Sequence, residues 1–143
     1  MRINFPDGAR EAFSQDKFTA AIDWTNGVYL SACALFRGDV KAKEVEENMA
    51  AIHKTLNFAS YVHTGVKLGV AETAPEGFAS SGLALVNHTG IAAVFERLVA
   101  NFDIMFDNHA YTHWYENAGV SRDMMATARN TIANLAKSYR DAS

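Results

Sequence analysis

Two histidines near the C-terminal end of this 143-residue sequence have the spacing that most suggests chemistry. His109 and His113 are four residues apart, so on a helix both imidazoles would lie on one face, where they could bind a transition metal. Asp107 and Glu116 are close in the sequence, but the spacing fixes no third ligand. We therefore predict no metal ion, and a histidine-based metal or enzyme module is the least favoured function.

Nucleophilic chemistry would need Ser31 or Cys33, with His53 or His63 as the base. Cys33 is the single cysteine, so no disulfide can form within the chain, which is typical of a reducing compartment. It lies in the middle of an uncharged run, where we expect an inert thiol in the core. The sequence therefore predicts no catalytic residue.

Two short motifs also favour a structural interpretation. The run Gly-Val-Lys-Leu-Gly at 65–69 is not followed by the Gly-Lys-Ser or Gly-Lys-Thr of a phosphate loop. Arg37 begins an Arg-Gly-Asp sequence, and we expect its guanidinium to pair with a nearby carboxylate. Neither motif predicts a cofactor site.

The composition predicts one globular domain, residues 1–143, that binds neither nucleic acid nor membranes. Hydrophobic residues make up 49% and charged residues 20%, a balance typical of a folded chain. The net charge of −3 argues against a basic patch for nucleic acid or anionic lipid. No apolar stretch reaches the ~20 residues that a spanning helix needs, and the N-terminus has no signal-peptide core. We expect a cytoplasmic protein.

Uncharged and alternating runs predict a small mixed sheet. Residues 28–36 carry no formal charge and are apolar on both faces, which is typical of a central strand covered on both sides. Residues 66–70 alternate, and residues 82–87 predict a second buried strand. The buried side chains of that second strand would be Leu83, Leu85 and Val86. Weaker patterns predict a strand at 2–6, a short helix within 9–21 and a loop at 73–81.

Helical periodicity recurs in three stretches. In residues 43–56 the apolar positions advance by four, three and four. Asn87 or Thr89 is expected to cap a second helix, and Ser121 a third. The apolar line of the second helix is Ile91, Val94, Phe95, Leu98, Phe102, Met105 and Phe106, the last three in the core. The line of the third is Met125, Ala128, Ile132, Leu135 and Tyr139. The order of elements predicts an α+β fold: a small mixed sheet with packed helices and two long C-terminal helices.

A series of motifs in order resembles the C-terminal half of the tubulin family, over roughly residues 27–140. Leu-Phe-Arg-Gly-Asp-Val at 35–40 resembles the family's aromatic residue followed by Arg-Gly. The residues at 43–49 resemble the helix that follows this motif in beta-tubulin. The remaining matches are residues 58–67, Asn-His-Thr-Gly-Ile-Ala at 87–92, Met-Phe at 105–106, His-Trp-Tyr at 113–115, and the gapless stretch 113–139.

The resemblance implies the activation or intermediate domain of a tubulin plus its outer helices, without the GTP-binding domain. The family's glycine-rich phosphate loop is absent from the sequence, and its catalytic acid would lie before Met1. The resemblance therefore implies no enzyme and no cofactor in this chain, with GTP present only if a separate nucleotide-binding half exists. Alpha and beta features are mixed, since the loop at 71–81 is short as in the beta form.

The resemblance also implies where subunits would meet. The connection that contains Tyr61 and His63, and the turn after His113, Trp114 and Tyr115, form longitudinal contacts in tubulins. We predict that Trp114 is mostly buried, with Tyr61, His113 and Tyr115 partly available for contact. Motor binding is not supported, because most carboxylates usual on the outer face of the last helix are absent.

We therefore predict a non-enzymatic, tubulin-like structural or assembly module. It would make subunit contacts in a cytoskeletal filament or bind a tubulin-like partner. The alternative is a homo-oligomeric scaffold unrelated to filaments. Self-association would then cover the apolar face that an intact tubulin packs against its nucleotide-binding half.

Overall fold

The computed structural model describes residues 11–142, except for the side chains of Gln15 and Ala42, and forms two compact units, Met1–His88 and Thr89–Ser143. The predicted strand at 2–6 lies outside the described residues. Within the range predicted to contain a short helix, the structure has a 3₁₀ turn, η1 (Gln15–Lys17). The single-domain organisation stays a prediction.

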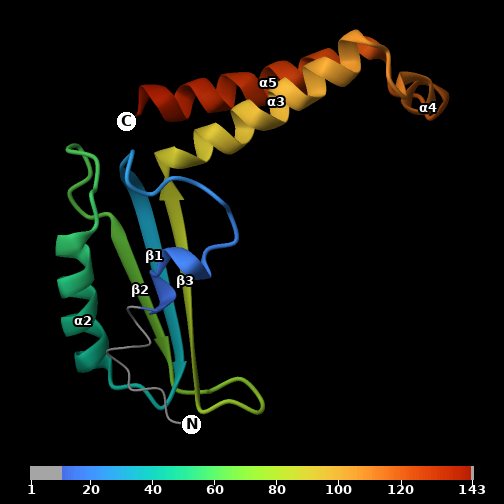
Figure 1. The fold of residues 1–143 in the computed structure, drawn as a ribbon. Coiled ribbons are helices and arrows are strands. Elements are labelled where there is room, and N and C mark those ends of the chain that lie inside the picture. Colours follow the sequence, from blue (N-terminus) through green and yellow to red (C-terminus); the bar gives the residue numbers. More distant parts are fainter. Residues whose placement is uncertain (1–10, 143) are drawn as a thin grey trace. The chain divides into compact units, whose positions relative to one another are not determined.

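The first unit contains a three-stranded mixed sheet in the order β2-β1-β3 (Figure 1). The central strand β1 (Tyr29–Gly38) runs parallel to β2 (Val66–Ala71) and antiparallel to β3 (Ser80–His88). A parallel pair needs a crossover connection, and helix α2 (Ala42–Thr55) supplies it. The three predicted strands, the helix and the central position of β1 are confirmed.

One face of this sheet is covered by α2. Val45, Met49 and Ile52 recur along one side of the helix and are buried against Ala34 and Phe36 of β1. Each such side chain stabilises the fold by about 1.5–3 kcal/mol when it is fully removed from water. This face is the core of the unit.

The opposite face of the sheet is much less covered than predicted. The register pairs Cys33 with Leu85 and Leu35 with Leu83, so these four side chains share that face. Leu83 is 51% and Leu85 57% exposed, so the prediction that β3 buries both leucines is wrong. Cys33 is half-buried there instead of lying in the core. The cause is topological, since the single crossover helix packs on one face only.

The end of β1 corrects the prediction for Arg37. Its Nε donates a hydrogen bond to the backbone carbonyl of Thr73 at 3.2 Å, and among the described residues no carboxylate pairs with it. The next residue, Gly38, has a φ of 104°, a conformation that favours glycine. Arg37 therefore ties the loop between β2 and β3 to the strand end.

The other end of the sheet is packed with aromatic rings. His88, the last residue of β3, is buried against the rings of Trp24 and Tyr29, with centroids 5.0 and 4.7 Å away. Phe18 stacks on Trp24 at 4.2 Å. Burial lowers the pKa of His88, while the negative charge of Asp23 raises it in part.

The second unit is a helical hairpin. A 3₁₀ turn, η2 (Thr89–Ile91), leads into α3 (Ala92–Asp107), followed by the short α4 (Thr112–Asn117) and the long α5 (Arg122–Asp141). The Ser121 hydroxyl accepts from the backbone N–H of Met124 at 3.2 Å, which confirms the predicted N-cap of α5. The two long C-terminal helices and the α+β class are confirmed. No described helix has the length and apolar character needed to cross a membrane.

Three details of the helical predictions are wrong. The N-cap of α3 is Ile91, without a side-chain hydrogen bond, because η2 already begins at Thr89. Met105 is 48% exposed, whereas Phe102 and Phe106 are half-buried and stack on each other at 5.1 Å. On α5, Met125 is buried but Ala128 and Leu135 are exposed. The apolar line on each helix is wider than the strip that the partner helix covers.

Candidate subunit-contact surfaces

The surface around α4 begins where α3 stops. His109 and Tyr111 both have left-handed backbone, with φ of 56° and 61°, which is uncommon for residues other than glycine. These two residues end the helical path after Asp107, and α4 starts again at Thr112. His109 and His113 therefore do not lie on one continuous helix, since α4 is a separate element.

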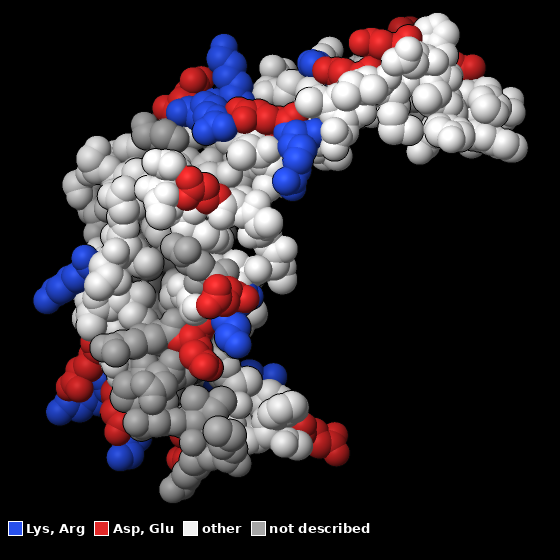
Figure 2. Space-filling view, viewed as in Figure 1, with Lys and Arg blue, Asp and Glu red and all other residues white. Residues whose placement is uncertain are grey.

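Helix α4 presents an exposed aromatic surface. Trp114 is 66% and Tyr115 57% exposed, Tyr111 and His113 are exposed beside them, and Thr112 is buried. The prediction that Trp114 is mostly buried is wrong, because the periodicity of α3 does not continue through the left-handed turn. Glu116 is the single charged residue of α4, and Figure 2 shows the region around α4 as largely uncharged.

A cation from α5 fixes the turn that precedes α4. Arg122 Nη1 lies 2.9 Å from His109 Nδ1, and the guanidinium carbon lies 4.6 Å from the centre of the Phe106 ring. The first contact is a hydrogen bond donated by Arg122, and the second is a cation–π contact. Together they connect the end of α3, the turn and the first residue of α5.

The same geometry separates the two histidines that are four residues apart in the sequence. His109 lies in the turn and His113 in α4, so the two imidazoles do not share a helical face. The His109 Nδ1 lone pair faces the positive charge of Arg122, which disfavours a metal cation at that atom. The described residues contain no group of three side chains suited to hold a metal ion.

The first unit contains the other predicted surface, the connection between α2 and β2. Tyr61 is 62% exposed and His63 is also exposed. Tyr29 N–H donates to Asn57 O at 2.7 Å, and Ala59 N–H donates to Tyr29 O at 3.0 Å. The base of the connection is thus paired like a short strand with β1, while its tip faces solvent. The exposure predicted for Tyr61, His113 and Tyr115 is confirmed, and their role in contacts stays a prediction.

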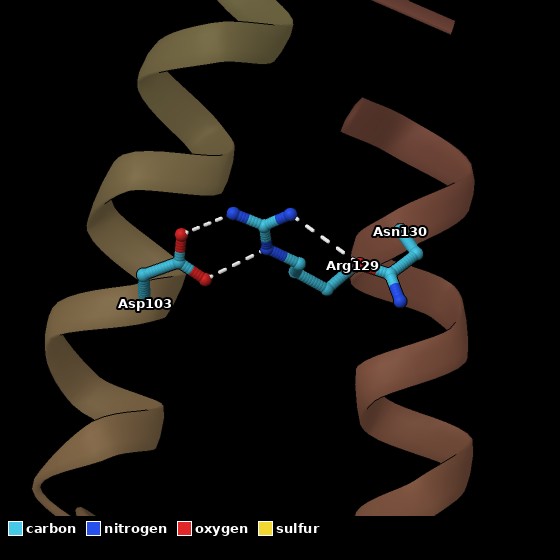
Figure 3. Close-up of polar contacts among 3 residues, drawn as sticks. All are labelled: Asp103, Arg129 and Asn130. Carbon is cyan, nitrogen blue, oxygen red and sulfur yellow. Dashed lines mark hydrogen bonds and ion pairs between the residues drawn. The ribbon is translucent and has the colours of Figure 1, made fainter. Parts of the chain in front are cut away.

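Two ion pairs connect α3 and α5. Arg129 holds the Asp103 carboxylate with two hydrogen bonds, one of them 2.9 Å from Nε, and donates a third to Asn130 (Figure 3). Arg140 pairs in the same way with Glu96. The hydrogen bonds from Arg129 lower the pKa of Asp103, and those from Arg140 lower the pKa of Glu96. Glu96, near the start of α3, pairs with Arg140 near the end of α5, and Asp103, further along α3, pairs with Arg129 earlier in α5. The two helices therefore run antiparallel.

Sequence reasoning missed Arg122 and Tyr111. Arg122 is thirteen residues from His109, and no sequence spacing predicts that a side chain of α5 reaches the turn. Tyr111 has a left-handed backbone without being glycine or asparagine, so its residue type gave no signal.

Comparisons with known proteins agree on one family. Residues 3–100 match the family described as "Tubulin C-terminal domain". The "Tubulin alpha-1 chain" of Arabidopsis thaliana is 31% identical over 150 residues, covering 98% of this chain and 33% of that protein. The "Tubulin alpha chain, nucleomorph" of Guillardia theta is 34% identical over 140 residues, covering 91% and 31%. The chain spans about a third of the length of these relatives.

Proposed function

This chain belongs to the tubulin C-terminal domain family, and from that premise we propose that it is a non-enzymatic structural module that makes subunit–subunit contacts. Its partner would be a tubulin-like subunit, in a filament or in a smaller assembly. The family match includes the connection that contains Tyr61 and His63. Since the chain spans about a third of its relatives, the activity and partners of whole tubulins enter only as part of this proposal.

The observation that carries the proposal is the surface around α4. It presents Trp114 and Tyr115 largely exposed on a helix with one charged residue. Tyrosine and tryptophan are enriched in protein interfaces and charged residues are depleted in their centres. A rigid aromatic side chain also loses little conformational entropy on binding. A fixed turn with exposed rings is thus suited to contact another folded subunit.

The proposal includes what this chain would not do. It would supply neither a nucleotide site nor a catalytic acid, and GTP would require a separate nucleotide-binding half. We propose no binding of nucleic acid or membranes, and a cytoplasmic, cytoskeletal location. Motor binding is not proposed, because α5 has only two carboxylates, Asp123 and Asp141. Several of its exposed positions are uncharged and polar: Thr127, Asn130, Thr131, Asn134 and Ser138.

Sedimentation of the chain with purified tubulin tests this function. We expect association at about 10–50 µM, and at least about tenfold weaker association for Trp114→Ala, which removes the largest exposed ring. Phe78→Ala is the matched control, because Phe78 is an exposed aromatic residue on the loop between β2 and β3. The proposal fails if wild type does not associate, or if both variants weaken association equally.

A second function is supported by the uncovered face of the sheet. Leu35, Leu83 and Leu85 form an exposed aliphatic patch there, and such patches are typical of interaction sites. A homo-oligomeric scaffold would bury it between copies. The expected result is a concentration-dependent mass in solution that Leu85→Glu abolishes, and a monomeric wild type at all concentrations would exclude this function.

A further inference from the structure

We propose that a cavity beside β3 binds a small aromatic zwitterion, a molecule with one flat aromatic group, one ammonium group and one carboxylate. The cavity has a volume of about 350 Å³ and lies within the first unit, between β3 and the stretch that contains η1. None of its lining residues belongs to α4 or to the connection between α2 and β2. The proposal therefore goes beyond the function proposed above and does not depend on it.

The cavity exists because α2 does not cover β3. The core under α2 includes Phe36 of β1 and has Val66 and Leu68 of β2 at its border, but it contains no side chain of β3. The stretch 11–18 lies beside β3 instead, as the position of η1 shows (Figure 1). That stretch contains a 3₁₀ turn of three residues, which covers less of a strand than a long helix does. Part of β3 is therefore left without a packed neighbour.

Small residues on β3 keep this space open. The register pairs Gly82 with Phe36 and Ala84 with Ala34, so Gly82 and Ala84 face the same side of the sheet as the core. A Cβ at Gly82 would lie 3.0 Å from the Phe36 ring and 3.9 Å from the Cβ of Ala12. A larger side chain at this position would fill the cavity. Its volume is within the range of roughly 300–1,000 Å³ that is typical of small-molecule sites.

The apolar lining of the cavity favours a flat aromatic group. Phe36, which is 2% exposed, and the half-buried Phe18 both line the cavity. Val40 and Ala84 add aliphatic surface. Aromatic rings pack well against other rings, either offset and stacked or edge to face. An aromatic ligand therefore matches this lining better than a purely polar one.

Two opposite charges line the same cavity. Glu11 and Lys17 are both exposed, the first before η1 and the second at its end. Neither forms an ion pair with any residue that the structure describes, since those ion pairs join other side chains. Glu11 is thus available for a ligand ammonium group and Lys17 for a carboxylate, and Ser80 and Ser81 add hydroxyl groups that donate and accept. This pair of charges is the reason for choosing a zwitterion.

Titration of the chain with L-tryptophan, followed by ¹H–¹⁵N correlation spectra, tests the site. We expect a dissociation constant of about 0.1–1 mM, with the largest shift changes at the amides of residues 80–84. Indole lacks both charged groups and should bind at least about fivefold more weakly. The proposal fails if about 10 mM tryptophan causes no shift changes, if they lie elsewhere, or if indole binds equally well.

Two charge variants assign the two ends of the ligand. Tryptamine keeps the ammonium group, and indole-3-propionate keeps the carboxylate. Glu11→Gln should weaken tryptamine binding about threefold to tenfold and leave indole-3-propionate unchanged, and Lys17→Gln should do the reverse. Glu76→Gln is the matched control, because Glu76 is an exposed carboxylate outside the cavity. If each variant affects both probes equally, or neither, these charges do not recognise the ligand and the zwitterion is wrong.

A cavity-filling variant tests the location independently. Ala12→Leu places a larger apolar side chain opposite Gly82 and should abolish the binding of tryptophan and indole, while a circular dichroism melt checks that the chain is folded. Ala12→Ser, which adds little volume, is the matched control and should bind like wild type. Unchanged binding by folded Ala12→Leu would place the ligand elsewhere and overturn the proposal. If Ala12→Leu does not fold, the charge variants decide, because they alter exposed side chains only.

Discussion

The two exposed aromatic surfaces of this protein are fixed by different kinds of interaction. The connection with Tyr61 is held at its base by backbone hydrogen bonds between Tyr29, Asn57 and Ala59. The turn before α4 has backbone hydrogen bonds as well, from His109 N–H to Phe106 O and from Ala110 N–H to Met105 O, but it adds the side-chain contact between Arg122 and His109. The second surface therefore depends in part on a side chain from α5, thirteen residues away in the sequence. Two similarly exposed surfaces thus differ in which interactions hold them: backbone hydrogen bonds at the base of one, and an added contact between two side chains at the turn of the other.

The two units also differ in the interactions that stabilise them. The first unit has a buried core on one face of its sheet, with Phe36 and Val45 almost fully removed from water. The helical unit depends on a narrower strip of half-buried rings and on the ion pairs of Arg129 and Arg140. We therefore expect the first unit to be more sensitive to loss of volume, and the second to pH and salt.

The largest expected loss of stability concerns the face of the sheet that α2 covers. Phe36→Ala should lower the free energy of unfolding of the first unit by about 3–5 kcal/mol, since it leaves a cavity under α2. Urea titration followed by the fluorescence of Trp24, in a Trp114→Phe background, measures this. Leu83→Ala, on the exposed face, is the control and should cost far less. Equal costs would show that the two faces are covered equally.

A smaller loss of stability is expected at Gly65, where the connection between α2 and β2 is closely packed. A Cβ at Gly65 would collide with the ring of Phe58, so Gly65→Ala should destabilise the first unit by about 1–3 kcal/mol. Gly69→Ala is the matched control, because its Cβ would meet only the end of the exposed Leu35 side chain, which can move. The same urea titration compares the two. A neutral Gly65→Ala would contradict the tight packing of the connection.

The pH response of the first unit should come from a buried group and not from its contact surface. The pKa of His88 is lowered by burial, so the unfolded state binds more protons as the pH falls below about 6.5. Stability is fully present above that value and falls with acidity by less than about 1.4 kcal/mol per pH unit. Urea midpoints at several pH values measure the slope, which His88→Gln should remove. An unchanged slope in that variant would assign the response to another group.

The smallest effect concerns the ion pair between α3 and α5. The pKa of Asp103 is lowered by Arg129, so its contribution is present above the ordinary aspartate range and is lost as the pH falls through and below about 4. Thermal melts by circular dichroism should show a small, salt-sensitive loss for Asp103→Asn at neutral pH, and little difference in acid. Glu116→Gln, at an exposed carboxylate of α4, is the control. Identical melts for wild type and Asp103→Asn at neutral pH would show that the pair adds nothing.

Much of the fold could be predicted, because it depends on interactions close in sequence. The periodicity at 43–56 became α2, the uncharged run became the central β1, and Ser121 capped α5. The motif series identified the family that the comparisons found. The candidate surface was predicted less well. Tyr61, His113 and Tyr115 are exposed as expected, but Trp114 is not buried.

The sequence by itself therefore determined which segments are helix or strand and to which family they belong, since local periodicity and motifs specify both. Only the tertiary structure decided that α2 covers a single face of the sheet and leaves Leu83 and Leu85 exposed. It also separated His109 from His113 and brought Arg122 of α5 to the turn. Those features depend on which residues meet across long sequence separations, and neither residue type nor spacing encodes them.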